Sequence, residues 1–167
     1  MTEIKFRTPL VSDAYSIHKL VRDNKPLDEN SLYLYVLLCH HFSDTCVVAE
    51  HDSRVIGFLS AFVSPKASDT LFVWQAAVDA EFRNQGIAKE LVFSALSQTG
   101  PSVRYVEATV TPSNTASLKF LQNFATELDA EFKKKPLFSS EILGKDHEQE
   151  DLVRIGPIQK NLLEVTA

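Results

Sequence analysis

The sequence is poor in cysteine and glycine. Of its 167 residues, 2 are Cys and 5 are Gly. Both cysteines, Cys39 and Cys46, lie in apolar surroundings, and neither has the close Cys or His spacing of a zinc site. This scarcity excludes a disulfide framework and argues against a metal site. We expect both thiols to be buried in the core.

Long hydrophobic runs and an excess of positive charge are also lacking. No apolar run approaches the roughly 18 residues that a membrane span requires, and residues 1–5 do not read as a secretory signal. We therefore expect a cytoplasmic protein without a membrane partner. The formal net charge of −5 argues against nucleic acid, which is usually bound by a basic face. An acidic pocket would instead suit a cationic substrate.

The order of predicted elements indicates the fold class. Apolar periodicity predicts helices that begin near Ser12, Ser31, Gly86 and Asn114, with Ser12 as the N-cap of the first. The predicted strands cover residues 4–7, 45–50, 55–63, 71–78, 103–111, 131–143 and 152–155. No linker or repeat interrupts them, so we expect one domain over residues 1–167. It is a mixed α/β (α+β) domain with helices against a mostly antiparallel sheet.

The segment from Trp74 to Ala88 carries the clearest chemical signal. A buried strand ends, a polar turn follows, and Arg83-Asn84-Gln85-Gly86-Ile87-Ala88 opens a helix. The first N–H groups of a helix are unpaired and its dipole is positive there, so the turn suits a pyrophosphate. Gly86 lets the main chain approach the ligand. Alternatively, Gly86 only caps a turn, but the flanking strand and helix favour the anion site.

Here the chain resembles the GNAT acetyltransferases, whose coenzyme A site has the pattern [Q/R]-x-x-G-x-[G/A], matched by Arg83, Gly86 and Ala88. The resemblance implies the GNAT acyl-CoA N-acyltransferase fold, with splayed fourth and fifth strands, helices on both faces, and acetyl-CoA as co-substrate without a metal. Asn114 matches the polar residue that holds the coenzyme's arm, and it can also cap a helix. The implied coenzyme-binding residues are Ala76, Ala77, Val78, Arg83, Asn84, Gln85, Gly86, Ile87, Ala88, Asn114 and Ser117.

A closer resemblance, to the L-2,4-diaminobutyrate acetyltransferases, runs through nearly the whole chain. Four separated motifs carry it: Pro26-Leu27-Asp28 with Asn30-Ser31, Phe72-Val73-Trp74-Gln75, residues 109–114 with Ala116-Ser117, and a tail of His147, Glu150 and residues 152–157. Lys25 and Ala76 depart from the family pattern without removing a functional group. The resemblance implies acetylation of the 4-amino group of L-2,4-diaminobutyrate in ectoine biosynthesis, hence osmoprotection, and a homodimer.

The implied reaction is a direct attack of the amine on the thioester. An alkylamine has a pKa of about 10.4, so the site has to remove a proton or favour the neutral form. The GNAT resemblance places an oxyanion donor among the backbone N–H groups of Ala76 to Val78. Asn114 and Glu107 are further candidates for the catalytic set, although Glu107 can equally pair with a basic neighbour. No Tyr lies between residues 114 and 130, so the general acid is unassigned and water can serve.

Diaminobutyrate carries two ammonium groups, so its pocket should contain acids. Asp28 and Glu150 are the candidate amine ligands, with a helix N-terminal acid and a solvated loop charge as the respective alternatives. Trp74 can bind an ammonium through cation–π attraction or pack in the core. Tyr33 can offer a hydroxyl or serve a packing role. His41, next to His40, falls on an apolar stripe and is expected to be packed.

Two alternatives remain open. One is a GNAT enzyme for another small cationic amine, such as a polyamine or an amino sugar. The other is a non-catalytic acyl-CoA sensor that keeps the phosphate-binding turn without turnover.

Overall fold

The computed structural model describes residues 3–25, 27–144 and 146–159. Pro26, which belongs to one of the sequence motifs, lies outside the described residues. The chain forms two compact units, Met1–Val63 with Val73–Gly100, and Ser64–Phe72 with Pro101–Ala167. The strand order is β1-β2-β3-β4-β5-β7-β6. No helix among the described residues is long and apolar enough to cross a membrane.

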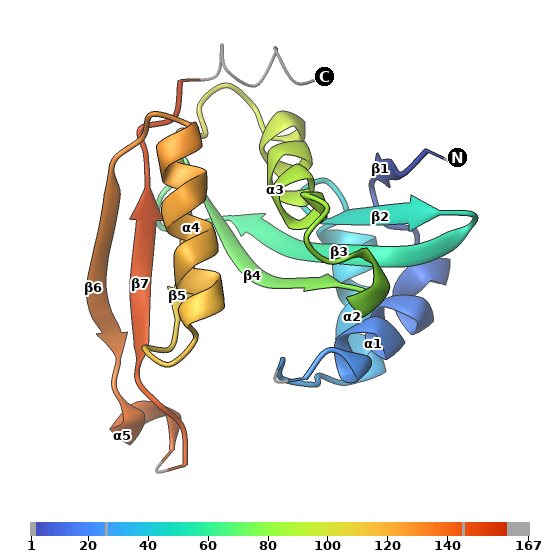
Figure 1. Cartoon of the computed structure of the whole chain (residues 1–167), viewed down its shortest axis with the longest axis horizontal. Helices are drawn as coiled ribbons and strands as arrows, with labels where there is room; N and C mark the ends of the chain where they lie inside the picture. Colours follow the sequence, from blue (N-terminus) through green and yellow to red (C-terminus); the bar gives the residue numbers. More distant parts are fainter. Residues whose placement is uncertain (1–2, 26, 145, 160–167) are drawn as a thin grey trace. The chain divides into compact units, whose positions relative to one another are not determined.

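The first unit contains an antiparallel arrangement of β1, β2 and β3 with three α-helices (Figure 1). Its elements are β1 (Lys5–Arg7), η1 (Val11–Asp13), α1 (Ala14–Asp23), α2 (Leu32–His41), β2 (Val47–His51), β3 (Arg54–Val63), residues 73–78 of β4 (Thr70–Val78), η2 (Ala80–Phe82) and α3 (Ile87–Gln98). The helix α1 packs beside α2 and against β3, and α3 packs on β2 and β3.

Helices cover both faces of the β2–β3 pair. Phe58 of β3 belongs to a buried cluster with the apolar residues of α1 and α2. The preceding residue, Gly57, points to the other face, because successive side chains of a strand alternate. A Cβ atom on Gly57 would lie 3.1 Å from Ala49 Cβ and 3.2 Å from Ile87 Cγ2. The glycine therefore lets α3 approach this face of the sheet closely.

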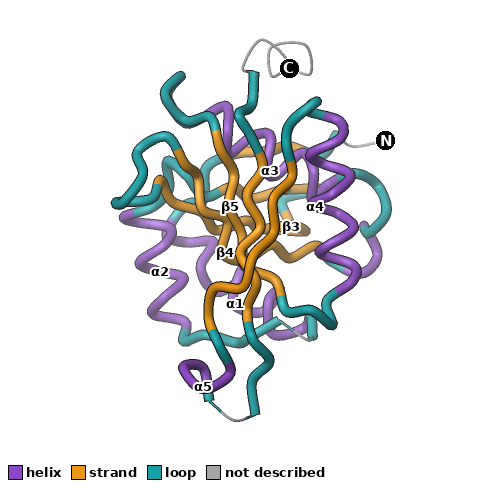
Figure 2. The backbone as a smooth tube through the Cα atoms, turned by 90° about the vertical axis from the view of Figure 1, so that its left-hand side faces the viewer, coloured by secondary structure: helices purple, strands orange, loops and turns teal. Residues whose placement is uncertain are grey.

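The second unit contains residues 70–72 of β4 and the strands that follow them. Its further elements are β5 (Tyr105–Val110), α4 (Thr115–Glu127), β6 (Phe132–Phe138), α5 (Ser140–Leu143) and β7 (Glu150–Ile155). Thr70–Phe72 pairs in parallel with residues 105–107 of β5, whereas β7 pairs antiparallel with both β5 and β6. Figure 2 shows α5 at the end of the β6–β7 hairpin. The predicted mixed α+β class with a mostly antiparallel sheet is confirmed.

Three local predictions were wrong. The helix α1 begins at Ala14, after η1, so Ser12 is not its N-cap. The strand predicted over residues 131–143 ends at Phe138, because the chain then turns into α5. His41 is exposed rather than packed and contacts His40 edge-to-face, with ring centroids 4.5 Å apart. The buried face of α2 is Tyr35, Leu38 and Cys39.

The two cysteines are free and buried, as predicted. Burial raises the pKa of the Cys39 thiol to about 12 and that of Cys46 to about 11. Because the thiolate is the reactive form, both thiols stay protonated and unreactive at neutral pH. No group of His, Cys, Asp and Glu in the described part of the chain could hold a metal ion.

An ion-pair cluster joins β1 to the start of α1. The Arg7 guanidinium donates to Asp13 Oδ2 at 2.7 Å and to Glu50 Oε2 at 2.6 Å. The backbone N–H of Leu10 also donates to Asp13 Oδ2, at 2.7 Å. Burial alone would raise the pKa of Asp13, but the hydrogen bonds from Arg7 and Leu10 outweigh it and lower that pKa below 3.8. The folded state therefore favours the ionised carboxylate.

We predict that Asp13→Asn lowers the free energy of unfolding at pH 7 by about 1–3 kcal/mol, because it removes a hydrogen-bonded charge. The pKa of Asp13 is lower in the folded state than its unfolded value of 3.8, so ionised Asp13 stabilises the fold at pH values above 3.8. This stabilisation is lost as the pH falls through the folded-state pKa. The difference from wild type, measured by urea unfolding, should thus shrink between pH 7 and pH 3. Asp23→Asn, at an exposed site, is the control. An equal difference at both pH values would refute the assignment.

Candidate active site

The turn before α3 presents unpaired backbone N–H groups. Gly86, the N-cap of α3, has φ 80° and ψ 0°, and Asn84 also has a positive φ, 61°. Residues 83–86 are exposed. Within the part of the chain that the structure describes, the N–H groups of residues 84–88 donate no hydrogen bond to a protein acceptor. Such a run of convergent N–H groups at a positive helix end is an anion-binding nest.

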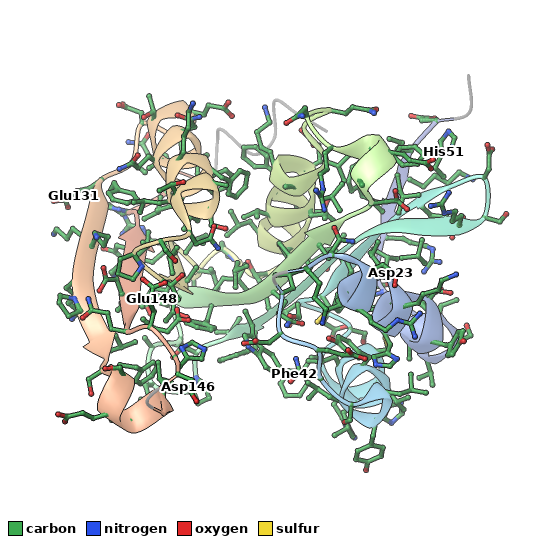
Figure 3. The ribbon with its side chains drawn as sticks, turned by 60° about the horizontal axis from the view of Figure 1, so that its bottom comes forward. Asp23, Phe42, His51, Glu131, Asp146 and Glu148 are labelled. Carbon is green, nitrogen blue, oxygen red and sulfur yellow. The ribbon has the colours of Figure 1, made fainter. Side chains whose placement is uncertain are left out.

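The Arg83 side chain is engaged within the protein. Its Nη2 atom donates to Asn24 Oδ1 at 2.5 Å, and its Nε atom donates to the Val78 carbonyl at 3.4 Å. Asn24, 7% exposed, in turn donates to the Leu20 carbonyl at 2.7 Å. It directly follows Asp23, the last residue of α1, which Figure 3 labels. Arg83 therefore fastens the anion-binding turn to the end of α1, and the binding groups of the turn are its main-chain amides.

The end of β4 leads directly into this turn. Ala76 is exposed, Ala77 is buried and Val78 is half-buried, which is the alternation of a regular strand. The N–H of Asp79 donates to the Ile56 carbonyl at 2.8 Å and fixes the end of the strand against β3. The candidate oxyanion donors around Ala76–Val78 and the anion-binding turn thus belong to one continuous segment of the first unit.

A loop between α1 and α2 carries the acceptor candidate Asp28, whose side chain is exposed. The loop backbone is held by β4, because Gln75 Nε2 donates to the Asp28 carbonyl at 2.9 Å. Gln75 Oε1 accepts from the Tyr35 hydroxyl at 3.2 Å. The loop also contacts α1, since His18 Nε2 lies 3.3 Å from Glu29 Oε1. The Asp28 carboxylate therefore extends toward solvent from an anchored main chain.

The two aromatic candidates for the acceptor site are both solvent-exposed. Tyr33, on α2, is 69% exposed, whereas Tyr35, two residues later, is fully buried. Trp74 is 44% exposed, next to the buried Gln75. Because side chains alternate along a strand, Trp74 and Gln75 point to opposite faces of β4. The residue on β4 that reaches the Asp28 loop is therefore Gln75, and contact of Tyr33 or Trp74 with an acceptor stays a prediction.

The remaining coenzyme candidates lie at the start of α4, in the second unit. Asn114 is the N-cap of this helix, and its Oδ1 accepts from the Ser117 N–H at 3.1 Å. The capping alternative is thus realised. The Asn114 Nδ2 group makes no hydrogen bond with the described residues and can still donate to a ligand. The neighbouring Ser113 hydroxyl bonds to the carboxylate of Glu148, labelled in Figure 3.

Glu107 forms an ion pair. Its Oε1 accepts from Arg154 Nη1 at 2.6 Å, across the β5–β7 register, and the same guanidinium lies 3.8 Å above the Tyr105 ring. The structure thus realises the pairing alternative for Glu107, and its participation in catalysis stays a prediction. Glu150, half-buried, begins β7 opposite Phe138.

The sequence predictions missed three residues of this region, namely Asn24, Tyr35 and Gln75. A signal existed for Gln75, because it is a lone amide in the apolar run of residues 71–78 and a buried amide requires hydrogen-bond partners. Nothing in the sequence indicated which partners it would have. Asn24 carried no such signal, since a polar residue after a helix is ordinary.

Comparison with known proteins places these features in a family. The model of the acetyltransferase (GNAT) family matches residues 14–125. An L-2,4-diaminobutyric acid acetyltransferase from Halalkalibacterium halodurans is 42% identical over 159 residues, which are 94% of this chain and 84% of that protein. Another, from Chromohalobacter salexigens, is 41% identical and covers 92% and 81% of the two chains.

Solved structures agree with the sequence comparison. The diaminobutyrate acetyltransferase EctA from Paenibacillus lautus, in complex with its substrate L-2,4-diaminobutyric acid and coenzyme A, has a TM-score of 0.89 and 41% identity, over 94% of this chain and 96% of that one. The ribosomal-protein-S18-alanine N-acetyltransferase from Escherichia coli, at 13% identity and a TM-score of 0.68, covers 94% and 96% and shares the fold.

We predict that Gly86→Val weakens coenzyme A binding about tenfold or more, a loss of about 1.4 kcal/mol. A branched side chain at φ 80° strains the turn and reorients its amides, although no atom lies within 4 Å of a Cβ at this position. Isothermal titration calorimetry with coenzyme A measures the effect. Gly144→Val is the control, because Gly144 also has a positive φ, 109°, and open space around a Cβ. Wild-type affinity in the Gly86 variant would contradict the site.

Proposed function

Because the chain belongs to the GNAT acetyltransferase family and, within it, to the L-2,4-diaminobutyric acid acetyltransferases, we propose that it acetylates L-2,4-diaminobutyrate. The acetyl group moves from acetyl-CoA to the 4-amino nitrogen and gives N4-acetyl-L-2,4-diaminobutyrate and coenzyme A. The observation that carries this proposal is the 41% identity and TM-score of 0.89 to an enzyme solved with that substrate and coenzyme A.

The coenzyme is bound through the main chain at the start of α3. Its diphosphate accepts hydrogen bonds from the N–H groups of residues 84–88, which have no acceptor within the described chain. Its pantetheine arm follows the end of β4, which leads directly into this turn. In the second unit, Asn114 Nδ2 is a further candidate donor to the coenzyme. The thioester then lies beside the backbone N–H groups of residues 76–78.

Acetyl transfer requires no acyl-enzyme. The lone pair of the neutral 4-amino group attacks the thioester carbonyl carbon, and the resulting oxyanion accepts a hydrogen bond from a β4 N–H. The tetrahedral intermediate collapses, the C–S bond breaks, and the amine nitrogen loses its proton to solvent or to a nearby base. Water protonates the leaving thiolate, since α4 offers no tyrosine. Holding both reactants on one strand supplies much of the rate gain.

Acidic groups bind the acceptor. Diaminobutyrate carries two ammonium groups and one carboxylate, and the exposed Asp28 carboxylate on its anchored loop complements one ammonium. In the same unit, the Trp74 face is a further ligand for positive charge and Tyr33 offers a hydroxyl, and both side chains are exposed. Glu150, in the second unit, stays a candidate ligand for an ammonium group. The coenzyme and the acceptor then meet along the end of β4.

The wider biology follows from this chemistry. The product is the acetylated precursor in ectoine biosynthesis, so the enzyme contributes to osmoprotection. It works in the cytoplasm, where acetyl-CoA is available, and as a homodimer, which the family resemblance implies.

A panel of amines tests the proposal. With acetyl-CoA, we expect kcat/KM for diaminobutyrate to exceed that for ornithine, lysine and spermidine at least tenfold, because a site formed for this acceptor would place the amines of longer chains away from the thioester carbonyl. Thiol release, followed with a thiol reagent, measures turnover, and the buried Cys39 and Cys46 add no background. A preference for spermidine would indicate another GNAT acceptor. Binding of acetyl-CoA without turnover of any amine would indicate a sensor.

A further inference from the structure

Gln75 is a buried amide in the middle of an apolar strand. Its side chain is 7% exposed, and it stands between the exposed residues Trp74 and Ala76. A carboxamide in such a place destabilises the fold unless both its oxygen and its nitrogen are hydrogen-bonded. Both are, and their partners come from one region: the loop between α1 and α2 and the first turn of α2.

The orientation of this carboxamide is determined by its partners. Burial raises the pKa of the Tyr35 hydroxyl, against the smaller opposing effect of its hydrogen bonds with Asn30. The hydroxyl therefore stays protonated at neutral pH and donates to Gln75 Oε1 at 3.2 Å. The Asp28 carbonyl can only accept, and it receives Gln75 Nε2 at 2.9 Å. The reversed amide would place its oxygen against the Asp28 carbonyl oxygen, which is two acceptors without a donor, so the Asp28 contact decides the orientation.

These contacts fix the loop through its main chain at Asp28. Gln75 Nε2 holds the main chain at the Asp28 carbonyl, and the hydroxyl of the fully buried Tyr35, on the helix after the loop, holds the Gln75 carboxamide. Glu29 of the loop makes more exposed contacts: its side chain is 39% exposed, and its carboxylate lies 3.3 Å from His18 Nε2 and 3.8 Å from Lys25 Nζ. Gln75 is 7% exposed and Tyr35 is fully buried, so their hydrogen bonds are better shielded from water and constrain the loop more than these exposed ion pairs.

We propose that Gln75 is a positioning residue for the acceptor amine, which rests on the proposed function. By holding the Asp28 carbonyl, its carboxamide sets the point from which the Asp28 carboxylate extends. Gln75 also belongs to the strand whose next residues supply the candidate oxyanion donors. The same strand therefore positions both the acceptor acid and the thioester site. This matters because a small misplacement of a bound reactant lowers the reaction rate by a large factor.

The test compares Gln75 variants with a matched control. Gln75→Leu removes both side-chain hydrogen bonds, and Gln75→Glu keeps an acceptor for Tyr35 but loses the donor to Asp28. Ser60→Ala is the control, because Ser60 is also buried and, among the described residues, its Oγ accepts from the Gln75 backbone N–H, at 3.1 Å, and not from the carboxamide. For each protein we would measure KM and kcat with diaminobutyrate, the Kd for coenzyme A, and the melting temperature.

We expect both Gln75 variants to raise the KM for diaminobutyrate at least tenfold, with the coenzyme Kd changed less than twofold. Ser60→Ala should leave the KM within twofold of wild type, even where its melting temperature falls. A merely structural role for Gln75 would lower the melting temperature and the active fraction without a selective change in KM. An unchanged KM in the Gln75 variants, or an equal rise in Ser60→Ala, would overturn the proposal.

A double-mutant cycle identifies the path of the effect. If Gln75 acts through Asp28, then the KM for diaminobutyrate of the double variant Asp28→Asn with Gln75→Leu should be no higher than the KM of the worse single variant. Additive losses would refute that path. Should Gln75→Leu fail to fold, Tyr35→Phe, which keeps the ring and removes the hydroxyl, should raise the KM about threefold or more, and an unchanged KM would count against the proposal. Absence of diaminobutyrate turnover by the wild-type enzyme would instead refute the proposed function.

Discussion

The unpaired peptide N–H groups at the start of α3 are the feature on which the proposed chemistry depends. The backbone of residues 84–88 is held in a conformation with positive φ at Asn84 and Gly86, and the described chain offers these amides no acceptor. Unsatisfied donors at a helix N-terminus attract a diphosphate. Such a ligand brings a thioester to a defined place only if the turn itself is fixed. Arg83 provides this, because its side chain is bonded to Asn24 and to the Val78 carbonyl.

A second constraint concerns the acceptor. The loop that carries Asp28 packs one apolar side chain, Leu27, against the core, and its main chain at Asp28 is held by Gln75, which Tyr35 holds in turn. In the proposed function, the strand β4 therefore serves both substrates in the first unit, because its end leads to the candidate coenzyme turn and its middle holds the loop of Asp28. This division explains why a polar residue is tolerated within a strand that is otherwise apolar from Leu71 to Val78.

The parts of this arrangement that depend on local sequence could be predicted. The strand, turn and helix from residue 71 to residue 98 follow from an apolar run, a polar break and a helical stripe, and α2 begins next to Ser31 as expected. The buried face of α2 could not be predicted, because this helix is apolar on nearly all sides and its periodicity lacks contrast. The side chain of Gln75 contacts residues that are 40 and 47 positions away in the sequence, and Glu107 and Arg154 are also separated by 47 positions. Such pairings depend on the tertiary fold.

The direct test of the diphosphate site is a titration of the ¹⁵N-labelled protein with coenzyme A, followed through the backbone amide signals of residues 84–88. The account predicts that these signals shift and that their hydrogen exchange slows as coenzyme A saturates the protein. Pantetheine, which lacks the diphosphate, should leave them largely unchanged. If coenzyme A binds with full occupancy while the amides of residues 84–88 keep their free positions and exchange rates, the central claim is wrong.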